Sequence, residues 1–209
     1  MTAPQHTAGD RPYLPPMGRR WLLPLYDPMT RLAGVSRVHD ELAGRADLRP
    51  GQRILEIGCG TGNLALTVAR RRPDAEVIGI DPDRGSVRRA ARKARRAGLP
   101  VRIERAYADD LPLPDASIDR VLSSFMWHHL GDDQKPGALR EIRRVLRPGG
   151  ELHLVDMAGE HAHHRRRMTG DHADRMLESL RAAGLTEVAV TGHGRVRAGA
   201  YTFYRAATS

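Results

Sequence analysis

Two groups of residues in this sequence have types and spacing that could bind a ligand. The segment Glu56-Ile57-Gly58-Cys59-Gly60-Thr61-Gly62 follows a short apolar run and holds three glycines in five residues. Glycine has no Cβ and adopts positive φ, so this turn lets a ligand approach the backbone closely. Asp81 follows a second apolar run, 19 residues beyond Gly62, where a carboxylate can accept hydrogen bonds from a ribose diol. The two features together predict an adenosine-type ligand.

The spacing of the glycines distinguishes between two kinds of adenosine ligand. Dinucleotide sites use G-x-G-x-x-G, whose glycines admit a pyrophosphate. Here the pattern is G-x-G-x-G, so Gly62 comes one residue early, and the acid Glu56 precedes the glycines within the apolar run. A tight strand-to-helix turn without a ligand also uses glycines, so the turn alone is weak evidence. Its combination with Asp81 is moderately specific.

Hydrophobic patterning predicts the elements that position these residues. Short β-branched runs, each suited to a buried strand, lie at 54–57, 77–80, 101–104, 120–124 and 151–156. Helical spacing of apolar side chains is found at 35–46, 63–72, 87–97, 139–146 and 173–183. Such alternation predicts a doubly wound α/β fold, a parallel sheet with helices on both faces. Ligands of such sheets bind at the carboxyl ends of the strands, where the glycine turn and Asp81 are expected.

The end of the chain breaks this alternation. Two runs, 187–191 and 201–205, follow one another without a helix between them, joined by a predicted turn at Gly192–Gly199. A connection this short joins antiparallel strands. Upstream, the helix at 139–146 is expected to stop at the Pro-Gly-Gly run of 148–150.

Length and composition restrict the class of protein. The chain has 209 residues, of which 40% are hydrophobic and 28% charged, as in ordinary globular domains. It has no run of about 20 apolar residues for a membrane span and no apolar signal core at its N-terminus. Cys59 is the only cysteine, so no intramolecular disulfide can form. We expect a cytoplasmic protein with a flexible tail at 1–20, a helical arm or lid at 21–50 and one main domain at 51–209.

The net charge of +9 is concentrated in one segment. Most of the excess lies between Arg84 and Arg96, and only two of the 34 basic residues in the chain are lysines. An arginine-rich helix could bind nucleic acid, but a solvated helix face explains the same pattern. We favour the solvated face and keep an RNA-binding surface as the alternative.

Four stretches of the sequence resemble the class I S-adenosylmethionine-dependent methyltransferases. They are ILEIGCGTGNLAL (54–66), VIGIDPD (77–83), YADDLPLPDASIDRVLSSFMWHHL (107–130) and LREIRRVLRPGGELHLVD (139–156). They occur in the family's order and spacing and together span most of residues 51–156. The resemblance implies S-adenosyl-L-methionine as the cofactor. It also implies a mostly parallel seven-stranded sheet in which the last strand inserts antiparallel.

The resemblance also implies which residues bind the cofactor. They are Glu56, Gly58, Cys59, Gly60, Thr61, Gly62, Asn63, Asp81, Pro82, Ala108, Asp109, Ser124 and Phe125. Glu56 and the glycine turn would border the methionine part, and residues 124–125 would touch it near the reactive sulfonium. Asp81 would bind the ribose hydroxyls, whereas Pro82 and residues 108–109 would lie beside the adenine.

One position departs from the family pattern. The family often has an acid four residues before the leucine of its LPLPD stretch, to accept a hydrogen bond from the adenine amino group. This chain has Tyr107 there. The phenol can accept that bond or stack on the ring, and a shift of register would put Asp109 or Asp110 in its place.

Candidate residues for catalysis lie after the fourth strand and in the arm. Methyl transfer from a sulfonium is an in-line displacement that depends mostly on alignment, and a base is needed only when the acceptor must lose a proton. His128 and His129 suit proton transfer near neutral pH, with a helix-start or packing role as the alternative. Tyr26 could close over the acceptor, or the arm could simply cover the sheet. The histidines of 161–172 lie beside three arginines at 165–167, which repel cations, so we predict no metal site.

The acceptor is predicted to be a small apolar or aromatic molecule, methylated at O, N or C. The arm offers apolar and aromatic side chains in the run WLLPLY at 21–26. After the fourth strand the chain has SSFM and lacks the NPPY-type tetrapeptide that serves amino groups of nucleic-acid bases. Nucleic acid and membrane are therefore not the expected partners. Two alternatives stay open: an RNA methyltransferase that uses the arginine-rich surface, and an S-adenosylmethionine-binding protein without catalysis.

Overall fold

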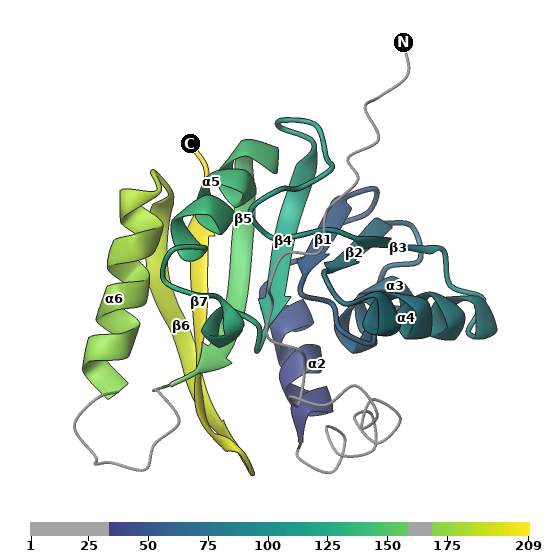
Figure 1. Cartoon of the computed structure of the whole chain (residues 1–209), viewed down its shortest axis with the longest axis horizontal. Helices are drawn as coiled ribbons and strands as arrows, with labels where there is room; N and C mark the ends of the chain where they lie inside the picture. Colours follow the sequence, from purple (N-terminus) through teal and green to yellow (C-terminus); the bar gives the residue numbers. More distant parts are fainter. Residues whose placement is uncertain (1–33, 159–168) are drawn as a thin grey trace.

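The computed structural model describes residues 34–158 and 169–209, the second range with side chains from residue 172 onward. Within these ranges a seven-stranded sheet has the order β3-β2-β1-β4-β5-β7-β6 (Figure 1). Its strands are β1 (Arg53–Ile57), β2 (Glu76–Asp81), β3 (Val101–Arg105), β4 (Ile118–Ser124), β5 (Leu146–Met157), β6 (Thr186–Val196) and β7 (Gly199–Ala207). β1 to β5 pair in parallel, and β7 lies antiparallel between β5 and β6. The predicted doubly wound sheet with an antiparallel last strand is confirmed.

Helices cover both faces of the sheet (Figure 1). They are α2 (Val35–Arg45), α3 (Asn63–Arg71), α4 (Arg84–Arg96), α5 (Lys135–Val145) and α6 (Thr169–Ala182), with the short 3₁₀ helix η3 (Trp127–His129). α2 and α3 share one apolar core with Ile54 and Val155, whereas α5 and α6 share a second core with Leu55 and Leu154. Neighbouring residues of β1 and β5 thus enter opposite cores. This explains why the strand sequences are apolar almost throughout.

The structure corrects the predicted turn at Gly192–Gly199. Most of that segment is strand, and only residues 197–198 separate β6 from β7. Gly192 provides space instead of a turn, because a Cβ on it would come within 2.5 Å of the Arg45 guanidinium. That guanidinium reaches across from α2 and donates a hydrogen bond to the Thr191 carbonyl. Gly192 therefore serves packing against α2, whereas Gly194 makes room for Tyr201 of β7.

The Pro-Gly-Gly run of 148–150 also differs from its prediction as a helix stop. α5 already ends at Val145, and the run lies within β5. Its backbone is paired with the end of the chain, since Gly149 N donates to Thr208 O (3.1 Å) and Thr208 N donates to Gly150 O (2.9 Å). These bonds hold as strand a segment whose composition is typical of a turn.

Several predicted segments lie outside the described residues. These are the tail at 1–20, the arm as far as residue 33 with Tyr26, and His161, His163 and His164. From residue 34 on, the arm forms α2, which buries Val38 and Leu42 in the core shared with α3. Over 34–158 and 169–209 no three metal-ligating side chains gather as a candidate ion site. None of the helices in those ranges has the length and apolar character needed to cross a bilayer.

Candidate functional site

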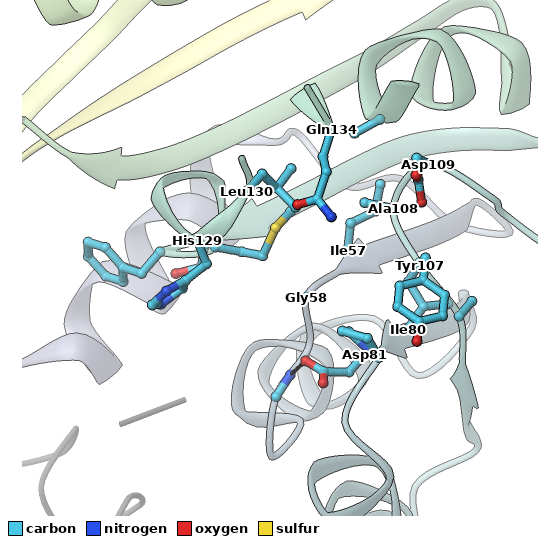
Figure 2. A pocket seen from close by; sticks show the side chains of 17 residues that line it. Ile57, Gly58, Ile80, Asp81, Tyr107, Ala108, Asp109, His129, Leu130 and Gln134 are labelled. Carbon is cyan, nitrogen blue, oxygen red and sulfur yellow. Dashed lines mark hydrogen bonds between the residues drawn. The ribbon is translucent and has the colours of Figure 1, made fainter. Parts of the chain in front are cut away.

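A cavity of about 920 Å³, open to solvent, lies at the carboxyl ends of β1, β2 and β4 (Figure 2). It is lined by Ile57, Gly58, Gly60, Ile80, Asp81, Pro82, Ala106, Tyr107, Ala108, Asp109, Ser124, Phe125, Met126, His129, Leu130, Gln134 and Ala138. Strands that run in parallel bring their carboxyl ends to one edge of the sheet, so residues far apart in the sequence meet there. This cavity therefore lies at the edge of the sheet where the sequence predicted a ligand to bind.

The glycine turn forms one wall of this cavity. Gly58, Gly60 and Gly62 all have positive φ, between 51° and 79°, which side chains other than glycine rarely adopt. A Cβ on Gly60 would meet no atom of the described residues within 4 Å, so this backbone opens into the cavity. A Cβ on Gly58 would overlap the side chain of Met126. The turn thus combines an open backbone surface at Gly60 with a covered one at Gly58.

Asp81 holds the glycine turn in place and presents its carboxylate to the cavity (Figure 2). Gly60 N donates to Asp81 Oδ2 and Asp83 N donates to Asp81 Oδ1, both at 2.8 Å. The side chain is almost fully buried, and this burial raises the pKa of Asp81 to about 6. Each carboxylate oxygen can accept more than one hydrogen bond, so Asp81 can still bind a ligand diol.

Glu56 lies behind the glycine turn and does not line the cavity. Its carboxyl group is buried and accepts a hydrogen bond from Ala65 N (2.7 Å) at the start of α3. Burial, reinforced by the nearby charge of Asp81, raises the pKa of Glu56 to about 8. Glu56 therefore supports the turn and the helix that follows it.

Four more predicted cofactor residues also lie off the cavity wall: Cys59, Thr61, Gly62 and Asn63. Burial raises the pKa of the Cys59 thiol well above its usual range, which keeps it protonated and unreactive. Asn63 Oδ1 accepts a hydrogen bond from Lys93 Nζ (2.5 Å) of α4. These contacts hold the turn against α4.

The predicted adenine end is a loop between β3 and β4 that α5 holds in position. Tyr107, Ala108 and Asp109 line the cavity, and Figure 2 shows them on its wall opposite His129. Leu111 N donates to Glu141 Oε2 (2.8 Å), while Arg144 donates to the carbonyl oxygens of Leu111 and of residue 113 (3.0 and 2.8 Å). This loop therefore takes its shape from two side chains of α5.

The end of β4 places an aromatic and a thioether side chain on the cavity wall. Phe125 has a φ of +52°, a backbone conformation that costs free energy and is frequent at functional sites. Its N–H donates to Val155 O (2.9 Å), which fixes the turn against β5. Met126 follows and covers Gly58. The strained turn thus directs residues 125–126 into the site.

His128 and His129 differ in their surroundings. His129 lines the cavity, whereas His128 lies behind it with its ring 4.1 Å from that of His129, measured between ring centroids. His128 Nδ1 lies 2.6 Å from Asp156 Oδ1, and Asp156 is fully buried at the end of β5. A buried carboxylate fixes both the orientation and the tautomer of an imidazole. The two histidines therefore offer proton-accepting nitrogens beside the cavity, with His128 held in place by Asp156.

The structure brings together most of the predicted site. Nine predicted residues line the cavity: Gly58, Gly60, Asp81, Pro82, Ala108, Asp109, Ser124, Phe125 and His129. Sequence reasoning missed the apolar wall at Ile57, Ile80, Ala106, Met126, Leu130 and Ala138, as well as Gln134 and the partner carboxylate Asp156. For Ile57, Ile80 and Asp156 the available signal was their position at strand ends, whereas Gln134 and Ala138 lie at the start of α5, where the sequence carried no such signal.

The chain is similar to known methyltransferases. The family described as a methyltransferase domain matches residues 54–150. The 27-O-demethylrifamycin SV methyltransferase of Amycolatopsis mediterranei is 42% identical over 123 residues, covering 58% of this chain and 44% of that protein. The demethylmenaquinone methyltransferase of Thermus thermophilus is 38% identical over 138 residues, covering 65% of this chain and 62% of that protein. The chain thus spans about half the length of these relatives.

A solved structure extends the similarity beyond that region. The [4+2]-cyclase SpnF is 29% identical with a TM-score of 0.68, covering 83% of this chain and 80% of that one. The seven-stranded order, the glycine turn with Asp81 at the carboxyl edge and these similarities agree with one another. The chain is therefore similar to the class I S-adenosylmethionine-dependent methyltransferases, most clearly over residues 54–150.

Proposed function

We propose that this protein binds S-adenosyl-L-methionine in the described cavity and transfers its methyl group to a small molecule. One observation supports this above the others: an open glycine backbone at Gly60 and a buried carboxylate at Asp81 share one wall and are hydrogen-bonded to each other (2.8 Å). The cavity combines an apolar lining with a few polar groups such as Asp81, Tyr107 and Gln134, as ligand sites do. The residues present therefore fit a nucleoside cofactor.

Each wall of the cavity has a role in this proposal. S-adenosylmethionine supplies a methyl group on a positively charged sulfur, which is already activated for displacement. Asp81 would accept hydrogen bonds from the ribose, Tyr107 with its neighbours 108–109 would border the adenine, and the open backbone at Gly60 would border the methionine part. Phe125 and Met126 exclude water from the methionyl end. The protein thus contributes alignment and a dry site.

The pair of His128 and Asp156 provides a place for a proton. An oxygen or nitrogen acceptor that must lose a proton needs a base near the cavity. His129 lies at the cavity wall, the ring of His128 contacts it at a tilt of 42°, and Asp156 lies behind His128. We assign proton acceptance to His129 and its support to the His128–Asp156 pair. Tyr26, which lies outside the described residues, stays a candidate for covering the acceptor.

The proposed acceptor is a small, largely apolar molecule. The part of the cavity near His129 is lined by Phe125, Met126 and Leu130. Two of the relatives are named for rifamycin and menaquinone precursors, which are small molecules. Neither observation identifies the acceptor atom. We therefore propose O-, N- or C-methylation of such a compound.

Calorimetric titration tests the cofactor. We expect the protein to bind S-adenosylmethionine and S-adenosylhomocysteine and not to bind NAD. A preference for NAD would contradict the proposal. A screen of small apolar and aromatic acceptors with a radiolabelled methyl donor then tests transfer. Methylated product is the expected outcome.

A second candidate function is binding of the cofactor without methyl transfer. The observation in its favour is that one similar structure, at 29% identity, belongs to a [4+2]-cyclase. The same titration and screen separate the two functions. Tight binding of S-adenosylmethionine without methylated product from any acceptor would favour the second candidate.

A further inference from the structure

Two buried oxygen atoms near His128 lack the hydrogen bonds that buried polar groups normally have. Asp156 is fully buried, and only its Oδ1 is bonded, to His128. Asp156 Oδ2 and the hydroxyl of Tyr204 make no well-formed hydrogen bond with any described residue, although the Thr202 hydroxyl lies close enough to Tyr204 to lower the pKa of its phenol. Tyr204 is 1% exposed, so neither group is compensated by solvent. An uncompensated buried polar group is costly, and such a pair of groups needs an explanation.

The register of β5 and β7 places these two side chains next to each other. Asp156 is opposite Thr202, and Leu154 is opposite Tyr204. Side chains alternate between faces along a strand, so Asp156 and Tyr204 lie on the same face as diagonal neighbours. Leu154 and Tyr204 both enter the core with α5 and α6, which identifies that face. Diagonal neighbours are within reach of an aromatic side chain.

The two groups are chemically complementary. Burial, together with the Asp156 charge, raises the pKa of Tyr204 to about 12, while the Thr202 hydroxyl opposes this rise. The phenol therefore keeps its proton at neutral pH and is a donor, whereas a carboxylate oxygen is an acceptor. A buried water between polar groups makes the same connection when they are too far apart for direct contact.

We propose that the Tyr204 hydroxyl donates to Asp156 Oδ2, directly or through one buried water, and that Tyr204 is a positioning residue for His128. In this arrangement the hydroxyl draws charge from the carboxylate and fixes its plane. The carboxylate in turn sets the basicity and orientation of the imidazole. The contact itself does not depend on the proposed function, whereas its consequence for turnover does.

Other titratable groups lie near Tyr204, Asp156 and His128, and they can affect the titration of His128. The ring of His129 contacts that of His128 from the same turn. His193 belongs to β6, the strand next to β7, and its Nδ1 lies 3.1 Å from the Thr202 hydroxyl. α6 packs on β6 and β7 and carries the partly buried His172. None of these is changed in the variants below.

NMR titration of the His128 imidazole tests the proposal in the full-length protein, with a His128→Gln variant to assign the signal. Removal of the donor in Tyr204→Phe leaves more charge on the carboxylate. We therefore expect the His128 pKa to rise by about 0.3 or more, since a neutral hydrogen bond affects a pKa by up to about one unit. In an Asp156→Asn background the same change should leave the His128 pKa where it is.

Tyr201→Phe is the matched control. It removes a hydroxyl from the same strand, but Tyr201 enters the opposite core with α2. We expect no shift of the His128 pKa in this variant. An unchanged pKa in a folded Tyr204→Phe protein, or an equal shift with and without the Asp156 carboxylate, would overturn the proposal.

A second measurement keeps the test decisive if Tyr204→Phe does not fold. Incorporation of 3-fluorotyrosine at position 204 makes the phenol a stronger donor at almost unchanged size, and the His128 pKa should then fall. A rise or no change would count against the contact. Where methyl transfer is measurable, Tyr204→Phe should lower kcat several-fold with unchanged KM for both substrates. Absence of transfer in the wild-type protein contradicts the proposed function and not the contact.

Discussion

Two buried carboxyl groups define the site at the scale of single residues. Asp81 forms the cavity wall, while Glu56 lies behind it, and burial raises the pKa of both. Two backbone donors hold the Asp81 carboxylate, at Gly60 and Asp83. One carboxyl group thus faces the ligand and the other supports the turn. Substitution should separate the two roles.

Asp81→Ala should weaken binding of S-adenosylmethionine by about 1 to 3 kcal/mol, since buried ribose hydroxyls would lose their acceptor. This corresponds to roughly 5- to 150-fold in the dissociation constant from titration calorimetry. Asp174→Ala, at an exposed aspartate of α6 that does not line the cavity, is the control and should bind normally. Equal affinity in the Asp81 variant would mean that the ribose lies elsewhere.

Glu56→Gln should stabilise the ligand-free protein at pH 8. The pKa of Glu56 is about 8 in the folded protein against an ordinary 4.5, so the fold favours the protonated form. Its contribution to stability is complete below about pH 4.5 and is lost as the pH rises towards 8. Glutamine keeps an acceptor for Ala65 N and has no proton to lose. We expect a Tm at pH 8 at least roughly 3 °C above wild type by calorimetry.

A matched variant checks this explanation. Glu76 is exposed and paired with Arg53, which lowers the pKa of its carboxyl group. Glu76→Gln should therefore bring no gain in Tm at pH 8. A similar gain in both variants would point to net charge instead of burial.

Residue types predicted part of the site and missed its partners. Asp81 and the glycines were predictable because their chemistry depends on local spacing. His128 was predicted as a candidate, but its partner Asp156 was not, because the two are 28 residues apart and meet only through the pairing of β4 with β5. Tyr204 is further still along the chain. Such contacts depend on register, which a single sequence does not reveal.

The glycine turn is the element that opens the cavity. Gly60 and Gly98 both have positive φ, 51° and 64°, and a Cβ on either would meet nothing in the described residues within 4 Å. Gly98 lies after α4, away from the cavity wall. An alanine would therefore be strained at either position, but only at Gly60 would its side chain enter the proposed cofactor cavity.

Gly60→Ala should abolish cofactor binding, whereas Gly98→Ala should leave it unchanged. Both variants should lose about 1 kcal/mol of unfolding free energy, because alanine is strained at positive φ. Chemical denaturation measures the loss of unfolding free energy that both variants share. Titration calorimetry measures cofactor binding, which only Gly60→Ala should lose. Normal binding by Gly60→Ala would show that the ligand does not approach this backbone.

Helix α4 has a row of like charges. Arg84, Arg88, Arg92 and Arg96 recur at every fourth position, are exposed, and make no ion pair with any described residue. Like charges four residues apart on a helix destabilise it by about 0.2–0.5 kcal/mol per pair. The buried face with Ala90 and Ala94 offsets this repulsion.

Arg92→Glu should therefore raise the stability of the protein. It removes two repulsive pairs, with Arg88 and Arg96, and replaces them with attractive ones, for a gain of about 1 kcal/mol. The gain should disappear in 1 M NaCl, because salt screens exposed charges. Arg92→Gln is the control and should show about half the effect. A gain that persists in high salt would exclude the electrostatic explanation.

The boundaries of the strands and helices show which parts of the fold could be predicted from the sequence. The central strands and their helices were predicted because both faces of the sheet are buried and the apolar runs are unambiguous. The hairpin was predicted with a long turn because Gly192 and Gly194 resemble turn residues, yet they make room for Arg45 and Tyr201. That requirement comes from side chains in distant elements. Composition alone does not distinguish it from a turn.

The net charge of +9 belongs to the whole molecule, and it bears on the RNA alternative. Elsewhere in the described chain arginines such as Arg53, Arg144 and Arg205 are paired with acids. The unpaired excess on α4 is on a helix whose exposed side carries no aromatic residue for base stacking. Helix α4 therefore lacks part of what single-stranded RNA recognition requires.

We expect no RNA binding at physiological ionic strength. Fluorescence anisotropy with a mixed-sequence single-stranded RNA should show weak association in low salt that disappears steeply as salt is added. Arg92→Glu should reduce the low-salt signal. Micromolar or tighter binding at 150 mM NaCl would instead revive the RNA methyltransferase reading.

The loop between β3 and β4 is fastened to α5 by Glu141 and Arg144, which bond residues 111 and 113, beyond Tyr107 and its neighbours in the sequence. The residues that these two side chains anchor are therefore not the ones that face the ligand at 107–109. Residues 106–110 could be exchanged for those of a relative, and the hydrogen bonds from Glu141 and Arg144 would still hold the loop against α5. A library confined to these five positions could change nucleobase preference in an otherwise untouched scaffold.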